Sequence, residues 1–81
     1  MNERQQATYD FAMARVQAGK EEALKAVLAE QFRVMDAMRG SGGFDRERMR
    51  EMSQKVSALL TPDGAREYEE WRAARRRERG R

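Results

Sequence analysis

Two apolar stripes separated by the glycine-rich segment Gly40-Ser41-Gly42-Gly43 restrict the possible folds of this chain more than any other feature. Apolar residues recur at steps of three and four along both stripes, which places each set on one face of an α-helix. The first stripe consists of Leu24, Val27, Leu28, Phe32, Met35 and Met38, and the second of Met49, Met52, Val56, Leu59 and Leu60. Because glycines allow the chain to reverse, the pattern predicts an antiparallel helical hairpin.

The first arm of this hairpin is expected to be one helix over residues 7–39. The apolar pattern continues toward the N-terminus through Phe11, Ala14 and Ala18. Gly19 interrupts it, and a glycine within a helix costs about 1 kcal/mol relative to alanine. A long packed helix tolerates such a cost, so one helix is preferred, and two helices hinged near Gly19 are the alternative.

The second arm and a third helix both have recognisable starting residues. After a turn at residues 40–44, Asp45 is a suitable N-cap for a helix over residues 45–60. The segment Thr61-Pro62-Asp63 combines an N-cap, a proline at the first helical position and an acidic residue that complements the helix dipole. A third helix is therefore predicted over residues 62–78, with Tyr68 and Trp71 on one face.

The small size of the chain favours self-association. Its 81 residues form one helical domain over residues 1–81, and no cysteine is present to form a disulfide. A single hairpin of this length buries too little apolar surface to be very stable. The expected fold is therefore all-α, with the hairpin and third helix pairing into a homodimeric helical bundle.

The methionines beside the turn are the first candidate site. The chain has neither histidine nor cysteine, and no nucleophile, general base or cofactor motif is visible, so we expect no enzyme activity and no cofactor. The methionines can fill an irregular core, present a pliable surface to an apolar segment of a partner protein, or hold Cu(I) or Ag(I). The candidate partner-binding residues are Met35, Met38, Met49, Met52, Phe32, Tyr68 and Trp71.

The basic tail at residues 72–81 is the second candidate site. It contains six arginines and one glutamate, whereas the rest of the chain is neutral to slightly acidic. Arginines of this kind can contact phosphates, and Trp71 can stack on a base. The candidate nucleic-acid contacts are Arg72, Arg75, Arg76, Arg77 and Arg79. The alternative is a solvated helix end, because cations are favourable at a helix C-terminus.

The sequence contains no apolar run of the roughly 20 residues that span a bilayer. The first ten residues are also polar, unlike a signal peptide. We therefore expect no membrane insertion and a cytoplasmic location, or a periplasmic one if a signal peptide has been removed.

Residues 44–72 contain the segment Leu60-Thr61-Pro62-Asp63-Gly64 between two predicted helices. With this segment they resemble the second half of the Spy/CpxP group, small periplasmic helical proteins named for an LTxxQ motif. Leu60 and Thr61 match the motif, Pro62-Asp63 resembles the Pro-Glu often found within it, and Gly64 stands where the motif has glutamine. The resemblance implies a dimeric, cradle-shaped protein that binds unfolded or partner proteins without ATP, or acts in metal or envelope-stress sensing. It implies no catalytic residue.

These observations rank three functions. The first is a non-enzymatic protein-interaction module, adaptor-like or chaperone-like, that binds a partner through its apolar methionine and leucine face. The second is a nucleic-acid-binding accessory protein that uses the arginine tail. The third is a protein that binds or senses a soft metal through the methionine pairs.

Overall fold

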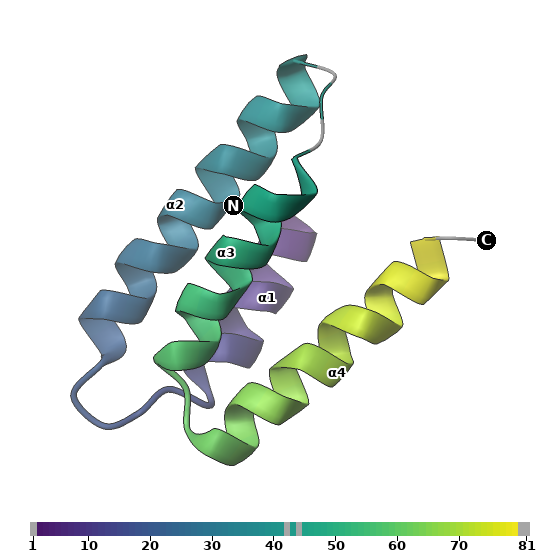
Figure 1. Cartoon of the computed structure of the whole chain (residues 1–81). Coiled ribbons are helices and arrows are strands. Elements are labelled where there is room, and N and C mark those ends of the chain that lie inside the picture. The colour runs from purple at the N-terminus through teal and green to yellow at the C-terminus, as the bar shows by residue number, and fades with distance from the viewer. Residues whose placement is uncertain (1, 42, 44, 80–81) are drawn as a thin grey trace.

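Four α-helices make up the described part of the chain, and no strand occurs in it (Figure 1). The computed structural model describes residues 2–41, 43 and 45–79, apart from the side chains of residues 41, 76 and 79. The helices are α1 (Glu3–Met13), α2 (Glu21–Ser41), α3 (Arg46–Ala58) and α4 (Pro62–Arg79). The prediction of an all-α fold is therefore confirmed. None of these helices is both long and apolar enough to cross a membrane.

Side-chain caps determine where three of the helices begin. Asn2 and Gln5 form a capping box at α1, in which the Asn2 side chain accepts from the Gln5 N–H at 2.8 Å. Asp45 accepts from the Arg48 N–H at 3.1 Å at the start of α3. Thr61 Oγ1 accepts from the Gly64 N–H at 3.1 Å, and α4 begins at Pro62. Each cap satisfies a backbone donor that has no partner within its own helix.

Two helices, rather than the single helix predicted over residues 7–39, occupy the N-terminal half. The chain leaves α1 after Met13 and enters α2 at Glu21. Gly19 lies between them with a φ of +83°, the left-handed conformation that glycine adopts without a Cβ clash. The hinge near Gly19, which was the alternative interpretation of the sequence, is the arrangement that the structure has.

Backbone hydrogen bonds join the α1–α2 linker to the α3–α4 linker and stabilise the break between α1 and α2. We call residues 15–17 and 59–61 the linker clasp. The Thr61 N–H donates to the Arg15 carbonyl and the Gln17 N–H donates to the Leu59 carbonyl, both at 3.0 Å. Val16 and Leu60 lie opposite each other between these bonds as an isolated antiparallel bridge. The Gln17 side chain also donates to the Leu60 carbonyl at 2.8 Å. The linker therefore gains hydrogen bonds that replace those of a continuous helix.

The apolar core draws residues from all four helices. Its buried members are Ala12, Leu24, Leu28, Phe32, Val56, Leu60 and Tyr68. α1 packs against α2 and α4, and α3 packs against α2 and α4. Helices α1 and α4 thus cover, within one chain, much of the apolar stripe for which the sequence suggested a dimer. Full burial of a leucine or valine contributes about 1.5–3 kcal/mol.

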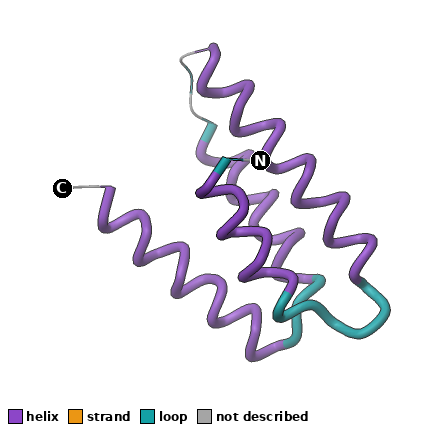
Figure 2. The backbone as a smooth tube through the Cα atoms, turned by 180° about the vertical axis from the view of Figure 1, so that it is seen from behind, coloured by secondary structure: helices purple, strands orange, loops and turns teal. Residues whose placement is uncertain are grey.

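Helix α4 is held close to the other helices at one end of the molecule and separates from them toward the other. At the first end the linker clasp joins the α1–α2 linker to the α3–α4 linker. From there α4 runs away from α3, so that its C-terminal half stands apart in both views (Figures 1 and 2). Side chains from all four helices fill only part of the space that this divergence creates.

Candidate anion-binding pocket

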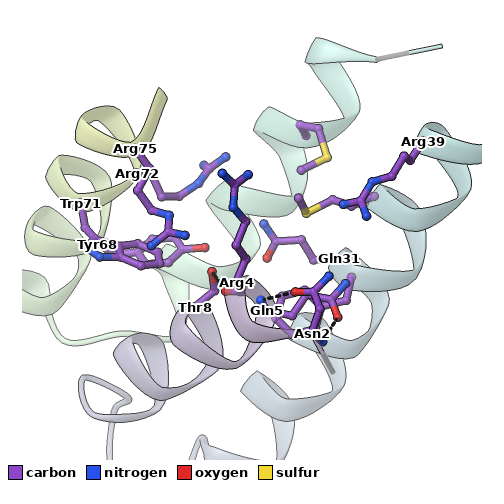
Figure 3. A pocket seen from close by; sticks show the side chains of 13 residues that line it. Asn2, Arg4, Gln5, Thr8, Gln31, Arg39, Tyr68, Trp71, Arg72 and Arg75 are labelled. Carbon is purple, nitrogen blue, oxygen red and sulfur yellow. Dashed lines mark hydrogen bonds between the residues drawn. The ribbon is translucent and has the colours of Figure 1, made fainter. Parts of the chain in front are cut away.

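A pocket with a cavity of about 120 Å³ lies where α4 diverges from the other helices (Figure 3). Its walls come from α1, α2 and α4, with one residue from the first turns of α3. The lining residues are Asn2, Arg4, Gln5, Thr8, Gln31, Phe32, Met35, Arg39, Met49, Tyr68, Trp71, Arg72 and Arg75. Four of them are arginines and none is an aspartate or glutamate. We call this site the arginine pocket.

The four arginines reach the arginine pocket from three helices. Arg4 extends from α1, Arg39 from α2, and Arg72 and Arg75 from α4 (Figure 3). The ion pairs among the described residues lie elsewhere, and they are Arg15–Glu67, Lys25–Glu22, Arg33–Glu30 and Arg66–Asp63. The Asp36 carboxylate accepts from the Gln5 side chain at 3.3 Å at the border of the pocket, but it forms no ion pair with these arginines among the described residues. Cations that lie close together repel one another, so an anion in this space would be favoured.

Aromatic rings hold the two α4 arginines in position. The Arg75 guanidinium carbon lies 4.7 Å from the centroid of the Trp71 ring, and that of Arg72 lies 5.8 Å from the Tyr68 centroid. Arg72 also donates to the Ser53 hydroxyl. Trp71 in turn stacks on Phe11 with centroids 4.7 Å apart and an interplanar angle of 13°. Because the Trp71 ring already contacts Phe11 and Arg75, it is not a free platform for a base.

Two polar groups beneath the arginines lack hydrogen bonds. The Tyr68 hydroxyl and the Gln31 Oε1 are buried, and neither has a hydrogen-bond partner within the described residues. The Gln31 side chain lies beside the Tyr68 hydroxyl, and the two groups are complementary, since the hydroxyl can donate and Oε1 can accept. Burial raises the pKa of Tyr68, and the neighbouring Arg72 guanidinium and the Gln31 side chain partly offset that rise. The phenol therefore stays protonated at neutral pH and can donate a hydrogen bond. An unsatisfied buried group costs about 1–3 kcal/mol, which a suitable ligand would recover.

The predicted methionine and aromatic site is mostly core. Met49, Met52, Phe32 and Tyr68 are buried, whereas Met35, Met38 and Trp71 are half-buried. The four methionines do not share one hollow. Met35 and Met49 line the arginine pocket, Met38 lines a groove beside the α2–α3 turn, and Met52 lines a third hollow with Lys55. No cluster of three or more carboxylates suited to a metal ion occurs among the described residues.

The arginines that the sequence predicted as one nucleic-acid site do not all lie in the same place. Arg72 and Arg75 line the arginine pocket, and Arg77 is exposed on α4. The side chains of Arg76 and Arg79 lie outside the described residues. Sequence reasoning missed Arg4, Arg39 and Gln31, because only the packing of α1 and α2 brings them to the α4 arginines. The Asn2-x-x-Gln5 capping pattern was the one available signal that a helix already begins beside Arg4.

The segment that resembles the Spy/CpxP group joins α3 to α4. Leu60 is buried in the core, and Thr61 caps α4. Gly64, which replaces the motif glutamine, is buried against Arg15 without space for a side chain. Searches of protein-family models, curated proteins and solved structures find no match to this chain, so the resemblance stays a prediction.

Proposed function

We propose that this protein is a non-enzymatic interaction module that binds an acidic segment of another protein at the arginine pocket. The observation that carries the proposal is the convergence of four arginines, from three helices, on one cavity whose lining includes no carboxylate. Arginine forks suit carboxylate and phosphate groups, which they bind through paired hydrogen bonds. An acidic segment would supply the negative charge that the described pocket lining lacks.

The proposed class of function is the one predicted from the sequence, a protein-interaction module, but the proposed binding surface is a different one. The sequence suggested the apolar methionine and leucine face, and much of that face lies in the core. Met35 and Met49 nevertheless line the arginine pocket, together with Phe32. A protein segment that pairs acidic with apolar side chains matches such a lining, because methionine adapts to the shape of its neighbour.

Nucleic acid is the second candidate partner. The observation in its favour is Arg77, which is exposed on α4 beyond the arginine pocket and extends the line of positive charge. A nucleic-acid backbone would follow such a line through successive phosphates. Against it, residues 41–71 carry seven acidic and five basic side chains, which would repel a long polyanion.

The binding unit that we propose is one chain. The sequence suggested a homodimer because a hairpin alone leaves its apolar stripe half covered. Leu24, Leu28, Val56 and Leu60 are almost fully buried within the single chain. Self-association is therefore not needed to bury these four residues.

Fluorescence anisotropy with labelled probes tests the proposal. The probes are a short Asp- and Glu-rich peptide, a neutral peptide of equal length, and single-stranded and duplex oligonucleotides, each at two salt concentrations. The pocket variant is Arg4→Gln with Arg39→Gln, because neither side chain has an ion pair or hydrogen bond within the described residues. The control is Arg46→Gln with Arg50→Gln, which removes the same charge from exposed positions on α3.

We expect the acidic peptide to bind, and the pocket variant to lose at least about 1.4 kcal/mol, which is tenfold in affinity. The control should lose much less, since exposed charges are screened by salt. Equal losses in both variants would show that binding follows net charge and would contradict the proposed site. Oligonucleotide binding that exceeds peptide binding, and that depends on Arg4 and Arg39, would favour the second candidate.

A further inference from the structure

We propose that the arginine pocket binds a phosphomonoester, presented by a phosphorylated side chain of the partner protein. This inference rests on the proposed function and names the acidic group that the pocket selects. Three observations carry it, and they concern the charge of the pocket, the unsatisfied groups beneath it and its size.

The charge of the arginine pocket matches a dianion better than a carboxylate. Arg4, Arg39, Arg72 and Arg75 provide up to four positive charges, and the lining contains no acidic residue. A phosphomonoester carries about −1.5 to −2 charges at pH 7 and three strong acceptor oxygens, whereas a carboxylate carries one charge and two oxygens. Several guanidiniums can therefore bind one phosphate at once, each through its own oxygen or pair of oxygens.

The Tyr68 hydroxyl adds a neutral donor beneath the charged ones. It is fully buried and has no hydrogen-bond partner among the described residues. In Figure 3 it points from α4 toward Gln31 and the stem of Arg4. A phosphate oxygen drawn in by the arginines would give this hydroxyl an acceptor. The buried Gln31 Oε1 lies beside this hydroxyl and can accept from it, so a bound phosphate must compete with Gln31 for the phenol O–H.

The size of the arginine pocket selects a terminal group. A cavity of about 120 Å³ has room for one small group at the end of a side chain. A phosphomonoester has that shape, because three of its four oxygens are free. An internal phosphodiester continues on both sides and carries a single charge, so the backbone of a nucleic acid is a poorer fit. These features favour a phosphorylated side chain over an oligonucleotide.

Isothermal titration calorimetry with matched peptides tests the inference. One short peptide is prepared with phosphoserine, aspartate or serine at its centre, and inorganic phosphate, O-phosphoserine and a 5′-phosphorylated oligonucleotide are titrated separately. The protein variants are the pocket pair Arg4→Gln with Arg39→Gln, the control pair Arg46→Gln with Arg50→Gln, and Tyr68→Phe. The last keeps the buried ring and removes only the hydroxyl.

We expect the phosphopeptide to bind at least about tenfold more tightly than the aspartate peptide, since it gains further charge-assisted hydrogen bonds. The pocket pair should abolish this preference, and Tyr68→Phe should reduce phosphopeptide affinity by about threefold or more while the fold is retained. Affinity should fall as pH is lowered through about 6, where the phosphate takes up its second proton. The aspartate peptide should show no such loss over the same range.

The remaining outcomes separate the inference from the proposed function. Equal binding of phosphopeptide and aspartate peptide, lost in the pocket pair, would overturn the phosphate inference and leave the proposed function standing. If no acidic peptide binds, both are overturned. Binding of inorganic phosphate or O-phosphoserine as tight as that of the phosphopeptide would overturn the protein partner as source. Tighter, pocket-dependent binding of the 5′-phosphorylated oligonucleotide would overturn it in favour of nucleic acid.

Discussion

Gly64 lies so close to Arg15 that a Cβ on the glycine would stand 2.7 Å from the Arg15 Cβ and 3.2 Å from its carbonyl oxygen. The same Arg15 carbonyl accepts the Thr61 N–H at 3.0 Å. The first turn of α4 therefore packs directly on the α1–α2 linker. Only glycine permits this approach, because every other residue would place an atom where Arg15 already is.

Gly64→Ala is expected to lower the free energy of unfolding by about 1–3 kcal/mol, as overpacking does in other tightly packed sites. In a chain of this size each kcal/mol corresponds to about 4–8 °C in melting temperature. Gly40→Ala is the matched control, since Gly40 is in α2 and a Cβ there would meet nothing within 4 Å. Thermal melting followed by circular dichroism measures both, and equal melting temperatures would contradict the close packing.

Tyr68→Phe is expected to leave stability unchanged or to raise it, because it removes a buried hydroxyl without a partner. The variant should also change how the free energy of unfolding depends on pH in the alkaline range. Burial raises the pKa of Tyr68 in the folded chain, so above about pH 10 the unfolded state ionises first and gains stability. The wild type should thus lose stability as pH rises past about 10, and the variant should lose less. Urea unfolding at neutral and alkaline pH makes the comparison, and identical pH profiles would refute it.

The methionines are expected to act as packing residues. Met35→Leu with Met52→Leu should cost less than about 1.5 kcal/mol, because the exchange conserves volume. The two residues line different hollows, so we expect no tight uptake of Ag(I) by the wild type. Calorimetric titration with Ag(I) decides between packing and soft-metal binding. Stoichiometric uptake that the double variant loses would favour the metal function.

The oligomeric state follows from the coverage of the apolar stripe. Since Leu28 and Val56 are fully buried within one chain, we expect light scattering to give the mass of a single chain at low concentration. The homodimer predicted from the sequence requires twice that mass. A dimer that persists on dilution, with helicity that falls only when it dissociates, would support the predicted bundle and contradict the single-chain unit.

Local chemistry made part of this fold predictable. The Thr61-Pro62-Asp63 segment marks the start of α4 because a cap and a proline act within one turn. Asp45 marks α3 for the same reason. The break between α1 and α2 has no such local cause. A continuous stripe and a tolerable Gly19 favoured one helix, and the bonds that decide against it come from Leu59 and Thr61, far along the chain.

The arginine pocket could not be predicted from the sequence either, because it too depends on contacts between segments far apart in the chain. Arg72 and Arg75 were predicted as site residues because they belong to an arginine-rich segment that is evident from the sequence alone. Arg4 and Arg39 are single charges in ordinary polar surroundings, and they gain significance only when α1 and α2 bring them to α4. Gln31 sits within an apolar stripe, where its burial without a hydrogen bond to Oε1 could not be read from spacing.

The linker clasp has a consequence for the lifetime of the native state. Helices that are neighbours in the chain also pack together, an arrangement typical of rapid folding. The clasp joins Gln17 to Leu60, 43 residues away, so loop-closure entropy opposes it until the helices have assembled. We expect it to form after the transition state. Gln17→Ala removes the side-chain bond and leaves the two backbone bonds of the clasp in place. It should accelerate unfolding in stopped-flow measurements while the folding rate hardly changes, so the clasp contributes to how long each folded molecule persists.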